Sequence, residues 1–207
     1  MERRKRVTAW LTRIAVSVSG GPLGRLRGSG ISQRLKRRVF ELPADAVAGV
    51  VDSLERSGVR AVIAGGWGVD ALLGEQTRKH LDLDLVFDAV DEPKAVAALE
   101  RAGFELVRRE DLRAPADAPL RLDARVVMTN ASGLLVDLHP AVLAPAARPD
   151  DLYAVGIIDG KEVRCLSVRG QLALHRGYDP KDFDREDVAR LEERFGSADG
   201  VPRAAAR

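Results

Sequence analysis

The sequence predicts an α+β (mixed α/β) fold, in which a mixed, partly antiparallel sheet is flanked by helices and followed by a small helical C-terminal part. Three observations support this class. Helical patterns and short apolar runs bounded by glycines alternate between residues 43 and 110. Two pairs of strand-like segments follow, each joined by a short polar turn, which favours antiparallel pairing. Residues 168–196 then return to helical periodicity.

The first helix and the first strand are predicted at residues 43–58 and 59–65. In PADAVAGVVDSLERSG, valine and leucine recur at helical spacing, and Gly58 suits the left-handed conformation that often ends a helix. The apolar run VRAVIAG is long enough for a buried strand and stops at Gly65 and Gly66. We therefore expect a glycine turn directly after a buried strand.

A short helix and an alternating strand are predicted next. The segment WGVDALLG, residues 67–74, is typical of a two-turn helix. LDLDLVF, residues 81–87, alternates apolar and acidic residues with period two, as does a strand with one buried face. EPKAVAALERAG, residues 92–103, predicts a helix with Pro93 in its first turn, and FELVRRE predicts the strand after it.

Two antiparallel pairs and two helices complete the predicted elements. RLDARVVMT and LLVDLHP flank the turn NASG, and YAVGII and KEVRCLSV flank Asp159-Gly160, a dipeptide that favours a tight hairpin. VRGQLALHRG and DREDVARLEERFG have helical periodicity. For the second of these helices we expect Asp184 as the N-cap and Gly196 just past the end.

Charge is distributed unevenly along the 207 residues, although 33 Lys/Arg and 31 Asp/Glu give a net charge of only +2. Residues 1–40 contain 11 Lys/Arg and a single acid, Glu2, which leaves 22 basic and 30 acidic residues in the rest of the chain. The sequence therefore predicts a basic arm on an acidic body. The overall balance is no argument for nucleic-acid binding, beyond a weak contact through the arm.

Four segments are expected along the chain. They are a basic, poorly ordered extension (1–40), a folded core (41–164), a helical segment packed on that core (165–196) and a tail (197–207). The start of the chain resembles a secretory signal, but Arg13 interrupts its apolar run. Because Cys165 is the single cysteine and no apolar run reaches the length of a membrane span, we expect a soluble cytoplasmic protein.

Asp82 and Asp84 form a carboxylate pair on the predicted strand 81–87. Their side chains project from one face, roughly 7 Å apart along the strand, while the leucines between them enter the core. Two carboxylates so placed repel, and divalent cations such as Mg²⁺ remove that repulsion. The motif is short, however, and an exposed acidic strand is the alternative interpretation.

Gly65 and Gly66 follow a strand and open a helix, a place where backbone N–H groups can face a phosphate. Taken alone, Gly-Gly often forms an ordinary turn. The segment has neither the P-loop pattern nor the G-x-G-x-x-G fingerprint. The glycines therefore indicate a phosphate site only in combination with their neighbourhood.

The run TRKH places Arg78, Lys79 and His80 directly before the carboxylate pair. Cations beside paired carboxylates suit a ligand that is both polyanionic and metal-bound, namely a nucleoside triphosphate. The alternative is that Arg78 or Lys79 pairs with Asp70 or Glu75 at the surface.

Asp137 is a third candidate acid, embedded in the apolar segment LLVDLHP. A buried carboxylate needs a cation, a metal or a raised pKa. His139 lies two residues further on, hence on the same face of a strand. Asp137 is therefore a candidate metal ligand or base, although a paired or capped Asp before a His-Pro turn is an alternative.

These residues together carry a family resemblance. IAGGWGVDALLGEQTRKHLDLDL resembles the signature of minimal nucleotidyltransferases of the polymerase β-like superfamily, specifically the aminoglycoside 2''-adenylyltransferase and lincosamide nucleotidyltransferase group. VDLHPAV and LALHRGYDPKDFDREDVARL are similar to that group's third-carboxylate strand and C-terminal helical segment. The resemblance covers roughly residues 43–196 and implies the nucleotidyltransferase fold, with residues 41–164 as its catalytic core.

The resemblance also implies roles for the candidate residues. The turn at Gly65 and Gly66 is expected to hold the triphosphate of an NTP, most simply ATP. Asp82 and Asp84 are expected to bind two Mg²⁺ ions. Asp137 is expected to be a further metal ligand, and whether it is also the general base stays open. The implied reaction transfers AMP, or another nucleoside monophosphate, to a hydroxyl of a small molecule such as an aminoglycoside or lincosamide, and pyrophosphate leaves.

Supporting roles are expected for the neighbouring residues. Arg78, Lys79 and His80 would neutralise the β- and γ-phosphates. Trp67 is expected to anchor the short helix by burial, and Asp70 to orient Arg78 or His80.

Some assignments stay open at the level of sequence. Tyr178 and Lys181 are candidates for contact with nucleotide or acceptor, with core packing and solvent exposure as their respective alternatives. A protein- or RNA-modifying nucleotidyltransferase and a non-catalytic nucleotide-binding or toxin–antitoxin module are the competing functions. The sequence identifies neither the acceptor nor the NTP, nor the oligomeric state.

Overall fold

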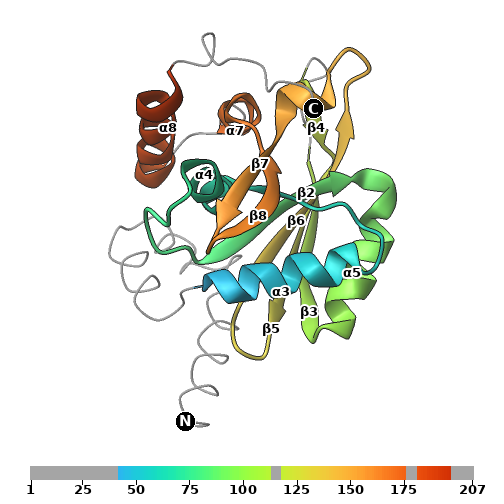
Figure 1. The fold of residues 1–207 in the computed structure, drawn as a ribbon. Coiled ribbons are helices and arrows are strands. Elements are labelled where there is room, and N and C mark those ends of the chain that lie inside the picture. The colour runs from blue at the N-terminus through green and yellow to red at the C-terminus, as the bar shows by residue number, and fades with distance from the viewer. Residues whose placement is uncertain (1–41, 113–117, 176–180, 197–207) are drawn as a thin grey trace, which may run out of the picture.

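The computed structural model describes residues 42–112, 118–175 and 181–196, which form one eight-stranded sheet with helices packed on it (Figure 1). The strands are β1 (Val62–Ala64), β2 (Asp82–Asp88), β3 (Phe104–Asp111), β4 (Leu120–Leu122), β5 (Ala124–Asn130), β6 (Leu135–Leu143), β7 (Tyr153–Ile158) and β8 (Lys161–Leu166). The helices are α3 (Ala44–Glu55), α4 (Gly65–Leu73), α5 (Glu92–Arg101), α6 (Pro149–Leu152), α7 (Val168–His175) and α8 (Asp182–Phe195), with the 3-10 turn η2 (Ala89–Asp91). The predicted α+β class is confirmed.

The sheet mixes antiparallel and parallel pairs. Its strand order is β3-β5-β6-β2-β1-β8-β7, and β4 pairs with β6. The two predicted antiparallel pairs are present as β5–β6 and β7–β8. β2 runs parallel to β6, and β1 runs parallel to β8. Segments far apart in sequence therefore become neighbours at the centre of the sheet.

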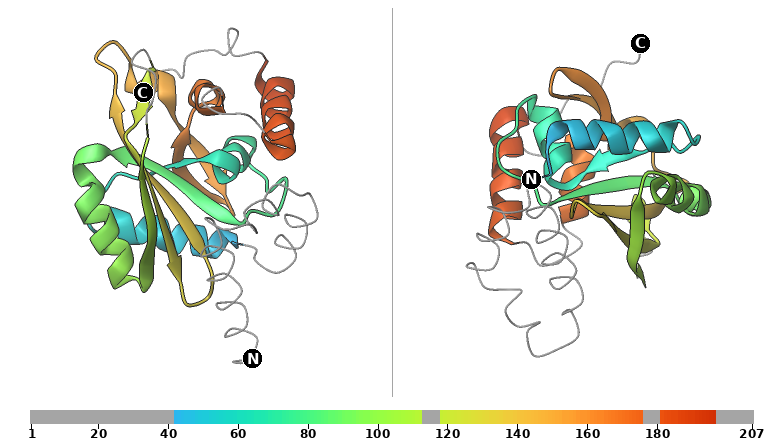
Figure 2. Two further views of the ribbon diagram at one scale, coloured as in Figure 1. Left: turned by 180° about the vertical axis from the view of Figure 1, so that it is seen from behind. Right: turned by 90° about the horizontal axis from the view of Figure 1, so that it is seen from below.

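The main hydrophobic core lies between one face of the sheet and the helices α3 and α5. Alternate residues of β2, namely Leu83, Leu85 and Phe87, are buried there together with apolar residues of both helices. Figure 2 shows the opposite side of the sheet in its left view, with β2, β5 and β6 in front of α3. Because side chains alternate along a strand, Asp82 and Asp84 project from that opposite face.

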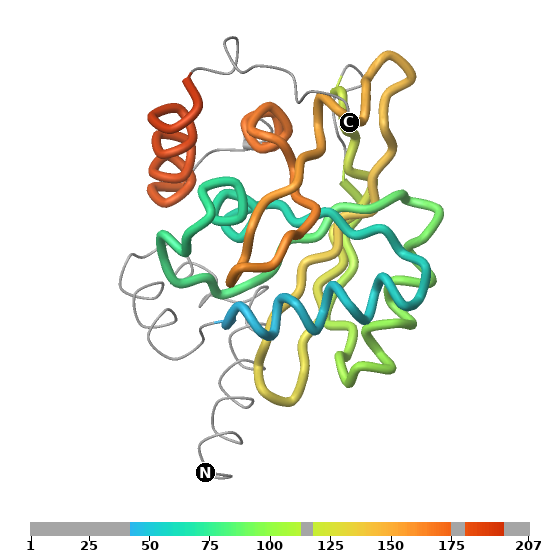
Figure 3. The backbone as a smooth tube through the Cα atoms, in the orientation of Figure 1, coloured from blue at the N-terminus to red at the C-terminus, as the bar shows by residue number. Residues whose placement is uncertain are grey.

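The C-terminal helices pack against α4. Val69 of α4, Val168 and Leu172 of α7 and Leu191 of α8 form a separate buried cluster. The path of the chain in Figure 3 places α7 and α8 beside α4, at one end of the sheet. None of the helices in the described part of the chain combines the length and the apolar character that crossing a membrane requires.

Two predicted helix starts differ from the structure. The helix expected at residues 67–74 begins at Gly65, because both glycines form its first turn rather than a separate loop. Helix α8 begins at Asp182, so Asp184 is the third residue of the helix and not its N-cap. The Asp184 carboxylate accepts a hydrogen bond from the Lys181 backbone N–H at 2.8 Å, and it therefore stabilises the helix start from inside.

Candidate active site

Asp84 and Asp137 lie directly opposite each other in the centre of the sheet. Parallel pairing of β2 with β6 aligns Asp84 with Asp137, and it aligns Asp82 with Leu135. Since side chains two residues apart share a face, Asp82, Asp84, Asp137 and His139 all project from the face opposite α3 and α5. The structure thus brings together acids that are 53 residues apart in the sequence.

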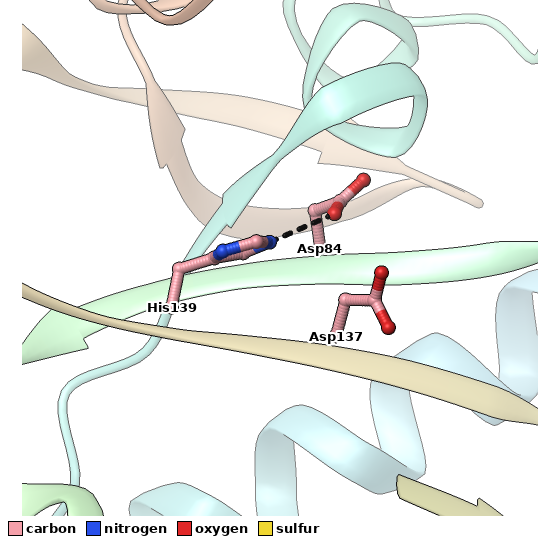
Figure 4. A group of neighbouring side chains, drawn as sticks. All are labelled: Asp84, Asp137 and His139. Atoms are coloured by element: carbon pink, nitrogen blue, oxygen red, sulfur yellow. Dashed lines mark hydrogen bonds and ion pairs between the residues drawn. The ribbon is translucent and has the colours of Figure 1, made fainter. Parts of the chain in front are cut away.

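Asp84, Asp137 and His139 form a group of potential metal ligands. One ligand atom from each side chain lies within 4.8 Å of the other two, and His139 Nε2 is 3.0 Å from Asp84 Oδ1 (Figure 4). Two carboxylates and an imidazole are a chemically suitable donor set for a divalent cation. Asp82, predicted to share the metal site, lies on the same face but outside this compact group.

Burial and the repulsion between carboxylates raise the pKa values of Asp82 and Asp137. Burial is the main cause that raises the pKa of Asp82 to about 7, with the negative charges of Asp84 and Asp137 adding to it. Burial and the Asp84 charge also raise the pKa of Asp137, against the opposing effect of Arg125. A bound divalent cation would favour the ionised carboxylates, so the site has the electrostatics expected of a cation site.

Arg125 of β5 forms an ion pair with Asp137 that the sequence analysis did not anticipate. Its Nε donates a hydrogen bond to Asp137 Oδ2 at 2.9 Å, and its Nη2 binds the same oxygen. Val127 is paired with Asp137. Arg125 lies two residues before Val127 on β5, so its side chain is on the same face of the sheet as the carboxylates. The signal in the sequence was an arginine on a strand face, which becomes informative only once the register is known.

Gly65 brings the start of α4 against Asp84. Gly65 has a φ of +58°, and a Cβ placed on it would lie 2.2 Å from Asp84 Oδ2. Gln171 of α7 donates a hydrogen bond from Nε2 to the Gly65 carbonyl at 3.4 Å. The first backbone N–H groups of a helix have no partner within it, so this turn presents donors beside the carboxylates.

Gly66 makes room for two predicted nucleotide-site residues. A Cβ on Gly66 would lie 2.4 Å from both Arg78 Nη2 and His80 Nδ1. His80 is buried and its Nε2 is 2.5 Å from Asp70 Oδ2, which confirms that Asp70 orients His80. Trp67 is only 2% exposed and its ring lies 4.8 Å from that of His80, which confirms its anchoring role.

Arg78 pairs with the C-terminal helix rather than with the acids expected from the sequence. Its Nε and Nη2 donate hydrogen bonds to Asp187 of α8 at 3.1 and 2.6 Å, and its guanidinium lies 5.1 Å from the Phe183 ring centroid. The alternative pairing with Asp70 or Glu75 is therefore wrong for Arg78. Asp187 was missed, although an acid on the buried face of a helix is a signal that a cation pairs with it.

The remaining predicted contact residues are exposed or lie outside the described residues. Lys79 is exposed. Lys181 is exposed at the start of α8, with its Nζ 5.3 Å from the Phe183 ring centroid. Tyr178 lies outside the described residues.

Sequence comparison finds similarity to antibiotic-resistance proteins and nucleotidyltransferases. A family model described as aminoglycoside-2''-adenylyltransferase matches residues 46–191. A lincosamide resistance protein of Staphylococcus haemolyticus is 29% identical over 149 residues, which is 69% of this chain and 90% of that protein. A 2''-aminoglycoside nucleotidyltransferase of Escherichia coli is 32% identical over 120 residues, or 51% of this chain, and the match spans 56% of that relative.

Two solved structures share the fold. The lincosamide antibiotic adenylyltransferase LnuA with bound lincomycin superimposes with a TM-score of 0.57 at 24% identity, covering 73% of this chain and 98% of that one. ANT(2'')-Ia in complex with adenylyl-2''-tobramycin gives a TM-score of 0.58 at 22% identity, covering 75% and 91% of the two chains.

Proposed function

The chain belongs to the aminoglycoside-2''-adenylyltransferase family of nucleotidyltransferases, and from this premise we propose that it transfers AMP from ATP to a hydroxyl group of an antibiotic. Pyrophosphate is the second product, and the reaction depends on Mg²⁺. Supporting the proposal is the convergence of Asp82, Asp84 and Asp137 on one sheet face, with the Gly65–Gly66 turn directly beside Asp84. That single arrangement supports a cation site directly beside a phosphate site.

In the proposed reaction, the acceptor hydroxyl oxygen attacks the α-phosphorus of ATP in line. The new oxygen–phosphorus bond forms as the bond from the α-phosphorus to the bridging oxygen breaks, and pyrophosphate leaves with that electron pair. Asp82, Asp84 and Asp137 would hold two divalent cations, which would supply stabilisation of negative charge on the attacking and leaving oxygens. The hydroxyl proton passes to Asp137 Oδ1, the oxygen that Arg125 does not bind.

Residues near the start of α4 are proposed to hold the triphosphate. The Gly65 and Gly66 backbone N–H groups bind phosphate oxygens at a helix N-terminus. Arg78, Lys79 and His80 supply positive charge or polar contacts on the same side. Among them Arg78 has the strongest support, because Asp187 fixes its guanidinium beside Gly66 and Asp82 is one of its charged neighbours.

The acceptor is proposed to be a lincosamide or an aminoglycoside. A lincosamide is the first to test, because the similarity to the lincosamide resistance protein extends over 90% of that relative. Similarity to the 2''-aminoglycoside nucleotidyltransferase covers 56% of that protein, which makes an aminoglycoside the second acceptor class.

An acceptor screen tests this proposal. The full chain is incubated with Mg²⁺, with ATP, GTP, CTP or UTP, and with lincomycin, tobramycin or a cell extract, and products are detected by mass gain and pyrophosphate release. We expect one antibiotic class to gain a nucleoside monophosphate. Asp84→Asn and Asp137→Asn should abolish the gain, whereas Asp88→Asn, an exposed acid on the same strand, should keep it. Transfer only to macromolecules of the extract, or full turnover in both Asn variants, would contradict the proposal.

A further inference from the structure

The ring of His139 lies where it can contact the same bound ion as Asp84 and Asp137. The parallel register pairs His139 with Val86, which lies two residues beyond Asp84 on β2. Because side chains two residues apart on a strand share a face, His139 lies on the same face of the sheet as Asp84 and Asp137. Figure 4 shows the imidazole extending along the sheet toward Asp84, with Asp137 on the neighbouring strand. The ring therefore lies beside the paired carboxylates and belongs to the same constellation.

The distances in this group match those between ligands of one ion. Adjacent ligands of a six-coordinate ion with bonds of about 2.1 Å lie about 3.0 Å apart, and His139 Nε2 is 3.0 Å from Asp84 Oδ1. One ligand atom from each of Asp84, Asp137 and His139 lies within 4.8 Å of the other two. A small contraction of the set would therefore bring all three atoms to one cation.

Burial fixes the His139 ring, and the Asp84 carboxylate binds one of its two nitrogens. His139 is 9% exposed, so packing holds the imidazole plane in place. Its Nδ1 is buried and has no hydrogen-bond partner among the described residues. In the metal-free protein the Asp84 carboxylate accepts a hydrogen bond from Nε2, so the proton lies there; because Nδ1 has no partner among the described residues, Nδ1 can carry the proton when a cation binds Nε2.

Asp82 is less well placed than His139 for this particular ion. It is aligned with Leu135 rather than with a polar residue of β6, and it lies outside the compact group. The nearest three donors are thus two carboxylates and one imidazole. That set differs from the three oxygen donors expected from the sequence.

We propose that His139 is a direct ligand of the divalent cation held by Asp84 and Asp137, and that this site consequently binds Mn²⁺ or Co²⁺ more tightly than Mg²⁺, the cation of the proposed reaction. Mg²⁺ takes oxygen ligands and water, whereas first-row transition metals bind imidazole readily. The inference rests on the proposed function for the existence of a cation site, and it adds the identity of one ligand and the class of metal.

Electron paramagnetic resonance of bound Mn²⁺ tests the ligand directly. The metal-free full chain is titrated with Mn²⁺, with and without a nonhydrolysable ATP analogue, and the bound ion is examined for hyperfine coupling to ¹⁴N. We expect a coupling typical of imidazole. In His139→Asn the coupling should disappear and the Mn²⁺ affinity should fall by about tenfold or more, while the Mg²⁺ affinity should change by less than about threefold.

Matched variants separate ligation from structural damage. Asp88→Asn removes an exposed acid of the same strand and should leave both the coupling and the Mn²⁺ affinity unchanged. Thermal melts of the metal-free variants show whether each remains folded. If His139→Asn unfolds, loss of the wild-type coupling upon Asp84→Asn provides the second test, because the two ligands would then share one ion.

The outcomes distinguish this inference from the proposed function. Bound Mn²⁺ without nitrogen coupling, together with an unchanged Mn²⁺/Mg²⁺ affinity ratio in His139→Asn, overturns the inference and leaves nucleotidyl transfer intact. Nitrogen-coupled Mn²⁺ in a chain that modifies no acceptor overturns the proposed function and supports the metal ligand. Absence of Mn²⁺ binding, even with the ATP analogue, overturns the inference.

Discussion

Arg125 holds Asp137 by a single carboxylate oxygen. Both Nε and Nη2 of Arg125 bind Oδ2, so neither of these bonds uses Oδ1, and the carboxylate lies on the sheet face that carries Asp84. Arg125 also opposes the increase in the pKa of Asp137 that burial and Asp84 cause. The arginine thereby favours the ionised form of the acid and fixes its orientation.

Replacing Arg125 should therefore impair catalysis through Asp137. In Arg125→Gln the pKa of Asp137 should rise further, so turnover at neutral pH should fall by about tenfold or more and recover partly at higher pH. Arg125→Lys keeps the charge and should be less impaired. The measurement is kcat for pyrophosphate release as a function of pH. A Gln variant with the wild-type pH profile would show that Arg125 does not act on Asp137.

Gly65→Ala should lose activity out of proportion to its loss of stability. The left-handed φ of +58° costs a side chain about 1 kcal/mol, and the added Cβ would lie 2.2 Å from Asp84 Oδ2 and 3.0 Å from Asp84 Cγ. The carboxylate must then move, so turnover should fall by about a hundredfold, in line with misplaced catalytic groups.

Gly74→Ala is the matched control for this substitution. Gly74 has a φ of +77° at the other end of α4, and nothing lies within 4 Å of an added Cβ. Its Ala variant should show a similar decrease in melting temperature with turnover close to wild type. Equal losses of turnover in the two variants would contradict a specific contact between Gly65 and Asp84.

The stability of the metal-free protein should decrease as the pH rises from about 4 to about 7. The pKa of Asp82 is raised from 3.8 in an exposed carboxyl to about 7 in the fold. In this window the folded state binds more protons than the unfolded state, so deprotonation favours unfolding. Melting temperatures measured in chelator should show this slope, and Asp82→Asn should reduce it.

A divalent cation should act most strongly at the alkaline end of that window. Ionised carboxylates bind cations and protonated ones do not, so Mg²⁺ or Mn²⁺ should raise the melting temperature more at pH 8 than at pH 5. An equal cation effect at both pH values would argue against binding at these acids.

Local pattern was sufficient to predict most elements and three of the acids. Period-two alternation identified Asp82 and Asp84 on one strand face, and an acid within an apolar run identified Asp137. Both signals are local, because they depend only on whether neighbouring residues are buried. The hairpins of the sheet were likewise predictable, since their turns and strands adjoin in sequence.

The partners of these acids were not predictable, because they depend on which distant segments pair. The parallel register of β2 and β6 decides that His139, rather than Asp82, completes the compact group with Asp84 and Asp137. Arg125 resembles any other charged residue on a strand until β5 is aligned with β6. Asp187 becomes a partner of Arg78 only when α8 packs near α4.

The ion pair between Arg78 and Asp187 should link the C-terminal helix to nucleotide binding. Asp187 is 1% exposed, so removing its charge leaves Arg78 without its main partner, at a cost of about 3 kcal/mol or more. Asp187→Asn and Arg78→Met should each lower the melting temperature, and the double variant should lose less than the sum of the two. Asp187→Asn should also raise KM for ATP more than KM for the acceptor, because Arg78 is released from its place beside Gly66.

Asp182→Asn is the matched control on the same helix. It breaks an ion pair with Arg185 in which the Asp182 side chain is 95% and the Arg185 side chain 60% exposed, so it should change stability by less than about 0.5 kcal/mol and leave both KM values unchanged. Additive losses in the double variant, or an unchanged KM for ATP in Asp187→Asn, would restrict this helix to a packing role.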